Sequence, residues 1–544
     1  MSRAGTGPGD AAADLTYADL WTRLLGTRIP RSVLDWWGPI GFALIGGFLR
    51  LFRLGQPSTL VFDESYYVKQ AHSMTQYGVE LRIHPDKADE VNRLFEAGDY
   101  DIYTLNGDLV VHPPLGKWLI ALGQTLFGVD NAFSWRIIGA FFGIAAILIL
   151  GRAVRRLTGS GFWGTVAAGL LAFEGSHFTH SRTGVLDIFM ATFVLAAFAC
   201  LLVDRDKSRE QLAWLTARRG EARLTGMGPD LGWRPWRLAA GALLGCAVAT
   251  KWSALVFLAV FGLLTVFWDW NARRVAGYSR WFDGTLVRDA PFAFVSMVGT
   301  SLVIYALSWI GWFRSEWGYA RHWAEANPAT GIARIIPDPL RSLAQFHHEM
   351  ITLTSGLSTE HAYASKPWTW MLQIRPTLFY KVETVAGTGD CPEGVTSCIR
   401  TVNSIGSPTI WWTGVLALVV VLVLWVAHRP WANAPRAFSL DWRLGAALSG
   451  ITAGYLPWFF TGDRTIYSFY IVSFVPWVIM GIVLSLIYLA DLGGTERARQ
   501  VAQGIGIALV VLSVVWFIYY YPVYAAQQIT HSQWQMRGLL PGWL

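Results

Sequence analysis

Long apolar blocks separated by short charged stretches run through this 544-residue sequence and decide what it can fold into. A helix needs about 20 apolar residues to cross the hydrocarbon core of a bilayer. Blocks of roughly this length lie at 34–54, 137–154, 161–176, 184–203, 236–250, 254–270, 290–313, 410–427, 444–460, 467–490 and 503–523. Only 15% of the residues are charged, whereas soluble domains average about 25%. The sequence therefore predicts an all-α polytopic membrane protein with about eleven transmembrane helices.

The Lys and Arg residues are distributed unevenly over the connecting loops. One set of loops is rich in them, with eight between 204 and 237, whereas the alternate short loops carry one each: Arg182, Lys251 and Arg464. Because cytoplasmic loops carry the excess of Lys and Arg, we expect a cytoplasmic N-terminus and a multi-pass protein of the plasma membrane. Residues 1–33 lack the apolar core of a cleavable signal peptide, so the first block is expected to act as a signal anchor.

This orientation divides the chain into segments and places two long loops outside the cytoplasm. The predicted segments are an N-terminal tail at 1–33, a membrane module at 34–313 with its outer loop at 55–136, a second outer loop at 314–409, C-terminal transmembrane helices at 410–523 and an extracytoplasmic tail at 524–544. The apolar stretch 114–128 is too short to span and predicts an interfacial helix. The basic residues form no single stripe, which argues against a nucleic-acid partner.

Four cysteines are present, and Cys391 and Cys398 lie close together in the second outer loop. Outside the cytoplasm such a pair can form a disulfide, with two free thiols as the alternative. The sequence contains no phosphate-binding Walker loop and no paired-glycine dinucleotide motif. His347 and His361 are too far apart for a compact zinc motif, so no metal site is expected.

An acidic pair, Asp63 and Glu64, follows the first apolar block by about ten residues. Paired acids at a membrane edge suggest a functional carboxylate. The alternative is that Asp63 caps a short amphipathic helix.

Cationic and imidazole side chains gather on the same predicted face of the membrane. They are Arg50, His112, Lys117, Arg136, Lys251, His347, His348, His361 and Arg464. Any one of them could merely pair with a neighbour and hold helices together. As a set with the acids, they suggest a site that binds an anion.

A carboxylate and several cations at the outer leaflet, without a nucleotide, suit glycosyl transfer from a lipid-linked phosphosugar. The leaving phosphate is already acidic, so cations need only neutralise and position it. The acceptor hydroxyl is a poor nucleophile, so one carboxylate must accept its proton. A single displacement of this kind inverts the anomeric carbon.

Several motifs resemble the protein O-mannosyltransferase family of the actinobacterial type, within the membrane-embedded GT-C class. They are FLRLFRLGQPSTLVFDE, HPPLGKWLIALG, SWRIIGAFFG, TKWSALVF, HHEM followed by EHAYASKPWTW, and DRTIYSFY. The resemblance implies a GT-C bundle that transfers mannose, with inversion, from polyprenyl-phosphate-mannose to Ser or Thr of secretory proteins. It implies no cofactor, leaves a divalent ion undecided, and leaves no room in 314–409 for the MIR domain of eukaryotic members.

The resemblance also implies roles for individual residues. Asp63 would be the base and Glu64 would position the acceptor or backbone, although the order could be reversed. Arg50, Arg136 and Lys251 would bind the donor phosphate or support the acids. The roles of the loop histidines are less defined.

Two other functions stay open at this point. A related transferase could act on a glycolipid or polysaccharide, since a carboxylate base can accept the proton of a hydroxyl from any of these acceptors. A lipid or solute transporter would explain the helices without chemistry, but its site would be expected near the bilayer midplane. Protein acceptors must be unfolded when they meet the site, so we expect coupling to the Sec translocon.

Overall fold

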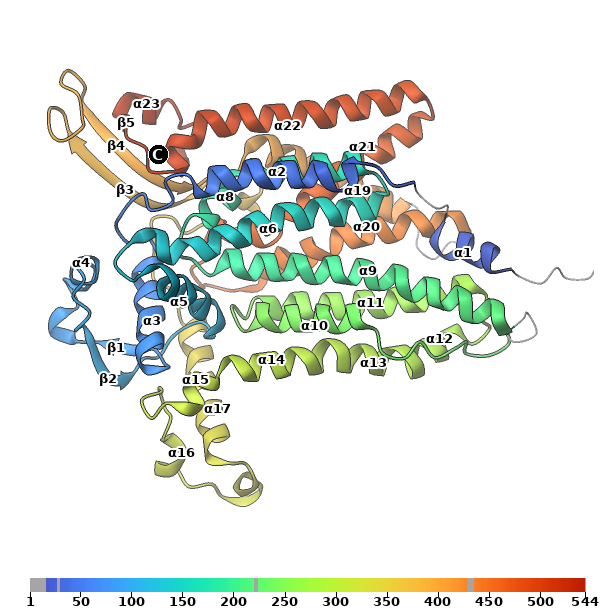
Figure 1. Cartoon of the computed structure of the whole chain (residues 1–544), viewed down its shortest axis with the longest axis horizontal. Helices are drawn as coiled ribbons and strands as arrows, with labels where there is room; N and C mark the ends of the chain where they lie inside the picture. Colours follow the sequence, from blue (N-terminus) through green and yellow to red (C-terminus); the bar gives the residue numbers. More distant parts are fainter. Residues whose placement is uncertain (1–15, 27–29, 220–223, 428–434, 544) are drawn as a thin grey trace, which may run out of the picture.

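The computed structural model describes residues 16–26, 30–219, 224–427 and 435–543. Two parts of the predicted N-terminal tail, 1–15 and 27–29, lie outside the described residues, as does 220–223 of the basic stretch 204–237. The C-terminus lies beside the strands at the left of Figure 1.

Long helices run side by side along the horizontal axis of Figure 1. They are α2 (Leu34–Leu51), α6 (Ala132–Thr158), α7 (Gly161–Ala172), α9 (Asp187–Arg219), α10 (Pro235–Val248), α11 (Ala254–Ala276), α19 (Pro408–Ala427), α20 (Pro435–Gly454), α21 (Val475–Gly493) and α22 (Glu496–Tyr524). One further rod combines α12 (Trp281–Gly284), η3 (Thr285–Asp289), α13 (Ala290–Phe294), η4 (Val295–Gly299), α14 (Thr300–Ser308) and α15 (Ile310–Arg314), with wider π-helical turns at η3 and η4.

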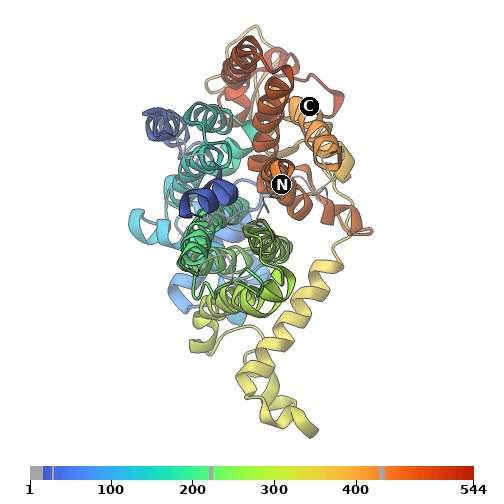
Figure 2. The same cartoon turned by 90° about the vertical axis from the view of Figure 1, so that its right-hand side faces the viewer.

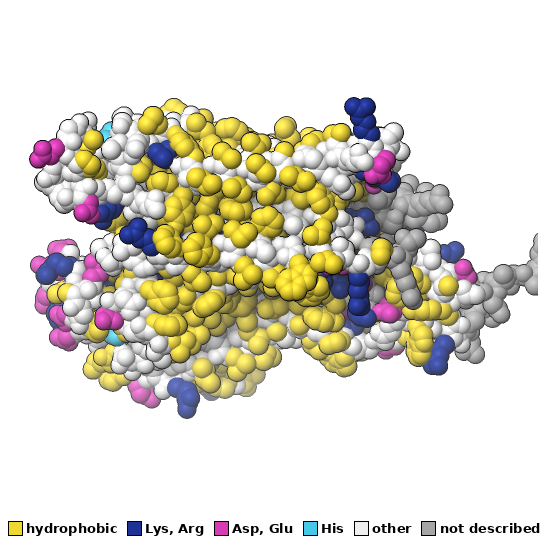
Figure 3. All heavy atoms as spheres, turned by 45° about the horizontal axis from the view of Figure 1, so that its top comes forward, with side chains coloured by type: hydrophobic (Ala, Val, Ile, Leu, Met, Phe, Trp, Pro, Cys, Tyr) yellow, Lys and Arg dark blue, Asp and Glu magenta, His cyan; other side chains and the backbone are white. Residues whose placement is uncertain are grey.

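The bundle carries a broad apolar belt, which Figure 3 shows between two ends where charged side chains gather. Seven helices of the described residues are long and apolar enough to cross a membrane: Ala132–Thr158, Asp187–Arg218, Ala254–Ala276, Trp281–Ser308, Pro408–Val426, Val475–Gly493 and Glu496–Tyr524. Two shorter apolar helices, α7 and α10, coincide with predicted blocks. The chain is therefore a multi-pass helical membrane protein.

Local sequence explains where these helices begin and end. At the start of α6, the side chain of Asn131 accepts a hydrogen bond from the backbone N–H of Ser134 at 3.0 Å. This cap satisfies one of the amides that a helix leaves unpaired. The helix ends at Gly159, whose φ of 76° is readily adopted by glycine, after Arg155 and Arg156 in its last turn.

The two predicted outer segments lie at one end of the bundle, which we call the loop end (left in Figure 1); the other is the far end. The first segment holds α3 (Glu64–Tyr77), β1 (Leu81–Ile83), η1 (Pro85–Lys87), α4 (Val91–Glu96), β2 (Tyr103–Gly107) and α5 (Leu115–Phe127). The second holds α16 (Trp323–Ala326), η5 (Gly331–Ile335), α17 (Asp338–Ser355), α18 (Pro367–Trp370), β3 (Thr377–Val385) and β4 (Ser397–Ser404).

Shorter elements complete the two ends. They are α1 (Tyr17–Leu25) at the far end and α8 (Gly175–Ser181), η6 (Leu456–Phe460), η7 (Ser468–Ser473), β5 (Ile529–Thr530), α23 (His531–Gln535) and η8 (Pro541–Trp543) at the loop end. The stretch predicted as an interfacial helix at 114–128 is the helix α5.

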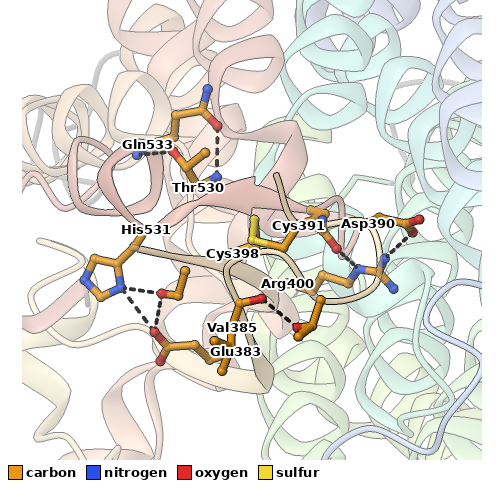
Figure 4. The surroundings of a disulfide bond; sticks show 12 residues. Glu383, Val385, Asp390, Cys391, Cys398, Arg400, Thr530, His531 and Gln533 are labelled. Carbon is orange, nitrogen blue, oxygen red and sulfur yellow. Dashed lines mark hydrogen bonds and ion pairs between the residues drawn. A yellow bond between two sulfur atoms is a disulfide. The ribbon is translucent and has the colours of Figure 1, made fainter. Parts of the chain in front are cut away.

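The expectation of an all-α chain is incomplete, because the loop end also contains two small antiparallel sheets. β1 pairs with β2, and β3, β4 and β5 form a second sheet in that order. At the tip of the β3–β4 hairpin, Cys391 and Cys398 are joined by a disulfide (Figure 4). Strand pairing depends on contacts distant in sequence, which apolar periodicity does not reveal.

A network of buried ion pairs ties helices together at the far end. Arg234, just before α10, donates to Asp204 of α9 at 3.0 Å and to Asp269 of α11 at 2.6 Å. Arg273 of α11 is paired with Asp289 through bonds of 2.5 and 2.7 Å. Buried charges persist only when paired in this way, so the network fixes the far ends of these helices relative to each other.

Candidate functional site

The two acids of the pair have different surroundings. Glu64 is fully buried, and its carboxylate accepts hydrogen bonds from Arg136 Nε at 2.7 Å and Nη2 at 2.8 Å. It also accepts from the backbone N–H groups of Gly184 at 2.7 Å and Val61 at 3.0 Å. With four donors in place, Glu64 has no lone pair directed at an open space.

The guanidinium of Arg136 also has hydrogen-bond partners for all three of its nitrogen atoms. Besides Glu64, it donates to the carbonyl oxygens of Leu54, Pro57 and Thr59 at 3.3, 2.7 and 3.0 Å. The guanidinium, fully buried on α6, thus holds the chain segment that leads into the acidic pair. Its hydrogen bonds all go to carbonyl oxygens and one carboxylate, which leaves it a structural support for the acidic pair.

Asp63, directly before α3, is only half-buried and lightly bonded. Its Oδ2 accepts one hydrogen bond from the hydroxyl of Tyr67 at 3.3 Å. Burial raises the pKa of Asp63 to about 6, the ammonium of Lys251 lowers it, and the carboxylate of Asp187 raises it. A carboxylate with a pKa near neutrality can both hold and release a proton under physiological conditions.

Lys251, between α10 and α11, forms a buried ion pair near Asp63. Its Nζ lies 2.9 Å from both carboxylate oxygens of Asp187 at the start of α9. The ammonium also lies 5.2 Å from the ring centre of Tyr470, within cation–π range. The structure thus brings Asp63, Lys251 and Asp187 into one electrostatic cluster.

A cavity of about 200 Å³ adjoins this cluster. Its polar lining includes His112, Asp187, Lys251, Arg464, Tyr470 and Ser473. Its apolar lining comes from α9, α11, α20 and η6 and includes Met190, Val256, Phe257, Ala453, Pro457 and Trp458. A neighbouring hollow of about 290 Å³ shares Trp252, Thr354, Thr461 and Arg464 with it. The lining of this space therefore combines cationic side chains with an apolar surface.

Arg464 differs from the other arginines at the loop end. It lines both hollows, and within the described residues its guanidinium has no hydrogen bond or ion pair; its Nε is buried without a partner. Arg50, by contrast, is fully buried and donates to the carbonyls of Gly46 and Ala172, both at 3.1 Å, and to Ser181. Arg50 therefore lies away from the cavity, whereas Arg464 can receive an anion.

His112 lies just before α5 and Lys117 in the first turn of this helix. Lys117 is fully buried, is ion-paired with Glu80, and donates to the carbonyl of His112 at 3.0 Å. Burial lowers the pKa of the His112 imidazole well below its ordinary value, and Lys251, Lys117 and Arg464 lower it further. His112 thus faces the cavity as a neutral ring.

His347 on α17 ends a hydrogen-bonded chain that begins at the cavity wall. Trp252 Nε1 donates to the hydroxyl oxygen of Tyr305 at 3.0 Å, and this hydroxyl lies 2.7 Å from His347 Nε2. Because His347 Nδ1 donates to the carbonyl of Leu343 at 2.7 Å, Nε2 accepts from Tyr305. His348 and His361 are exposed and line neither hollow.

Three partners in these clusters were not among the residues predicted for the site: Asp187, Tyr305 and Glu80. Asp187 pairs with Lys251, Tyr305 with His347 and Glu80 with Lys117. The partners in these pairs are 37 to 64 positions apart in the sequence. Asp187 carries a visible signal, an acid at the start of an apolar block. Among the described residues, no three His, Cys, Asp or Glu side chains form a group suited to a metal ion.

Two family models and several curated relatives match this chain. Residues 41–218 match the family model "Dolichyl-phosphate-mannose-protein mannosyltransferase", and residues 339–543 match "C-terminal four TMM region of protein-O-mannosyltransferase". The chain is 35% identical over 511 residues to the polyprenol-phosphate-mannose–protein mannosyltransferase of Mycobacterium tuberculosis, covering 92% of this chain and 90% of that protein. It is 32% identical to the Corynebacterium glutamicum protein of the same name, covering 96% and 94%.

A solved structure supports the fold. The structure of the Saccharomyces cerevisiae protein O-mannosyltransferase Pmt1–Pmt2 complex bound to the sugar donor superposes with a TM-score of 0.69 at 14% identity, covering 96% of this chain and 94% of that chain. The two family models together match more than half of the chain, and the relatives cover more than nine-tenths of it. The chain belongs to the protein O-mannosyltransferase family.

Proposed function

We propose that this chain transfers mannose from polyprenol-phosphate-mannose to Ser or Thr hydroxyls of proteins, with Asp63 as the base. The family and its nearly full-length relatives carry the nature of donor and product. One observation carries the assignment of the base: Asp63 is half-open and lightly bonded, whereas Glu64 is enclosed by four donors.

The donor would lie with its phosphate at the cationic side chains of the cavity and its prenyl chain along the apolar wall. Arg464 is the best placed phosphate ligand, because its guanidinium has no other partner among the described residues. Lys251 is paired with Asp187 in this structure, and its ammonium can turn toward the donor phosphate when that phosphate competes with the Asp187 carboxylate. Trp458 and Phe257 would contact the isoprenoid chain.

The reaction then proceeds as a single displacement. The acceptor oxygen forms a bond to the anomeric carbon while its proton passes to a carboxylate oxygen of Asp63. The bond between the anomeric carbon and the phosphate oxygen breaks, and its electron pair leaves with polyprenyl phosphate. Arg464 and Lys251 stabilise the negative charge that develops on the leaving oxygen. Attack opposite to the leaving group inverts the anomeric centre.

The proposal includes the orientation of the chain in the membrane. We infer a GT-C type bundle with eleven crossings, a cytoplasmic N-terminus and the cavity on the extracytoplasmic side. The Lys and Arg distribution supports this orientation. The far end carries Arg152, Arg155 and Arg156 in the last two turns of α6, and cytoplasmic ends of membrane helices are rich in such residues. Acceptors would be unfolded secretory proteins delivered near the Sec translocon, because an extended segment can reach a base at the membrane edge more easily than a folded domain can.

Replacing Asp63 with Asn tests the base. Transfer of labelled mannose from purified polyprenyl-phosphate-mannose to a Ser/Thr peptide should fall by about 10²-fold or more, as expected for loss of a general base. Asp89→Asn, an exposed acid in the same outer segment, serves as the matched control and should keep the parental rate. A near-parental rate for Asp63→Asn would remove Asp63 from the mechanism.

A further inference from the structure

A short apolar turn projects from the second outer segment. We call residues 331–340 the arm; it comprises η5 and the start of α17. Ile332 is 85% exposed, Ile335 79%, Ile336 46% and Leu340 49%. Four large aliphatic side chains are thus exposed within ten residues, and we call them the apolar patch; clustered exposed apolar side chains of this kind mark interaction sites.

The position of the arm limits what can cover this patch. The arm follows α15, the last turn of a membrane-crossing rod, by fewer than 20 residues. Figure 2 shows α17 and the arm extending sideways beyond the bundle, and Figure 1 shows them at the loop end below α14 and α15. Leu302 and Leu307 on α14 are 66% and 57% exposed. The arm therefore lies at the same end of the bundle as the last turns of a helix that exposes apolar side chains.

Basic side chains flank the apolar patch. Arg334 is exposed between Ile332 and Ile335, and its Nε donates to the carbonyl of Ala329 at 3.2 Å. Arg341, on the first turn of α17, is paired with Asp338 at 2.8 Å. Aliphatic residues that alternate with arginine are typical of segments that lie in the interface of a bilayer, where the guanidinium reaches the phosphates.

We propose that the arm inserts into the lipid surface at the loop end of the bundle and anchors α17 there. A bilayer fits the patch better than a protein partner does. A stable protein interface takes roughly 20 residues per side, and the arm offers ten. A membrane surface, however, is already present beside the exposed face of α14 and needs no matching shape.

The anchor would act on the cavity through α17. This helix runs from the arm to Thr354, which lines both hollows. It also carries His347, which is linked to Trp252 through the hydroxyl of Tyr305. Lipid contact at one end of α17 would therefore fix the position of the cavity wall at the other end. This inference concerns a membrane contact and does not depend on the identity of the sugar.

Fluorescence quenching in lipid vesicles tests the proposal on the full-length protein. Ile332→Cys and Ile335→Cys are each labelled with a small environment-sensitive dye in phosphatidylcholine vesicles containing 20% phosphatidylglycerol. Asp89→Cys, at an exposed site of the first outer segment, is the matched control. The parental chain, treated identically, gives the background from Cys200 and Cys246. Retained mannose transfer shows that each labelled variant is folded.

Lipids with a nitroxide near the headgroup should quench both arm dyes at least twofold more than the Asp89→Cys dye, and iodide in the water should quench the arm dyes less. Strong iodide quenching with no nitroxide quenching at either arm position would overturn the proposal. Protection from both quenchers would also overturn it, and would indicate a second copy of the chain or a bound protein over the arm.

Discussion

The contrast between Glu64 and Asp63 predicts opposite effects for the same chemical change at adjacent positions. Glu64→Gln keeps the size of the side chain but removes its charge, which leaves the fully buried Arg136 guanidinium without its counterion. Removing one partner of a buried ion pair costs about 3–5 kcal/mol. The three carbonyls that Arg136 also contacts moderate the loss, so we expect about 3 kcal/mol.

Asp63→Asn is the matched variant. A carboxyl whose pKa is higher in the folded than in the unfolded chain destabilises the fold above that pKa, and burial raises the pKa of Asp63 to about 6. Removing its charge at pH 7.5 should therefore leave stability unchanged or increased. Mannose transfer, in contrast, should be nearly abolished in Asp63→Asn and reduced in Glu64→Gln only as far as the site is displaced.

Thermal unfolding of both purified variants in detergent, followed by intrinsic tryptophan fluorescence, measures the difference. At about 2 °C or less per kcal/mol for a chain of this size, Glu64→Gln should lower Tm by roughly 5 °C. Asp63→Asn should stay within about 1 °C of the parent or lie above it. A lower Tm for Asp63→Asn together with an unchanged Tm for Glu64→Gln would refute the assignment of the two acids.

Three further perturbations test other parts of the site. Because the pKa of Asp63 is about 6, the initial rate of the parental enzyme should fall from pH 8 to pH 5 with a midpoint near 6, and a flat profile would contradict a titrating base. Arg464→Gln should raise the KM for the lipid donor about 10- to 100-fold, the loss of one charge-assisted contact, with Arg464→Lys in between; equal kinetics for all three would exclude a phosphate contact. Cys391→Ser should lower the free energy of unfolding by about 2.5 kcal/mol, measured by thermal melts, because the unfolded chain regains the conformational entropy of the short loop that the disulfide closes.

The multi-pass helical character was predictable because apolar block length is a property of consecutive residues. The number of crossings was less so, since seven helices of the described residues are long and apolar enough to span, against about eleven predicted blocks. The block at 503–523 lies within α22 and the block at 410–427 within α19. The block at 467–490 was placed too early, since its first residues form η7 and the helix begins only at Val475. Pro476, tolerated in the first helical turn, marks this later start.

The sequence predicts which acidic and basic residues lie near one membrane edge, but it does not predict their contacts. Of the predicted residues, Arg50, His348 and His361 line neither hollow. The sequence shows that Arg136 and Arg464 are basic residues near the same membrane edge, but not that Arg136 is enclosed by carbonyls while Arg464 is unpartnered among the described residues. Such differences come from segments distant in sequence. Asp187 illustrates the same point, since its pairing with Lys251 depends on how α9 and α11 pack.

The ion pairs at the far end have a consequence for the membrane as an electrical barrier. Arg234 clamps α9 to α11 there, while the cavity separates parts of the same helices from α20 and η6 at the loop end. Opening the loop end to admit a long prenyl chain sideways therefore requires no gap at the opposite end. We expect the far ends of α9 and α11 to stay joined during such an opening, which would keep this part of the bundle closed to ions while a substrate enters.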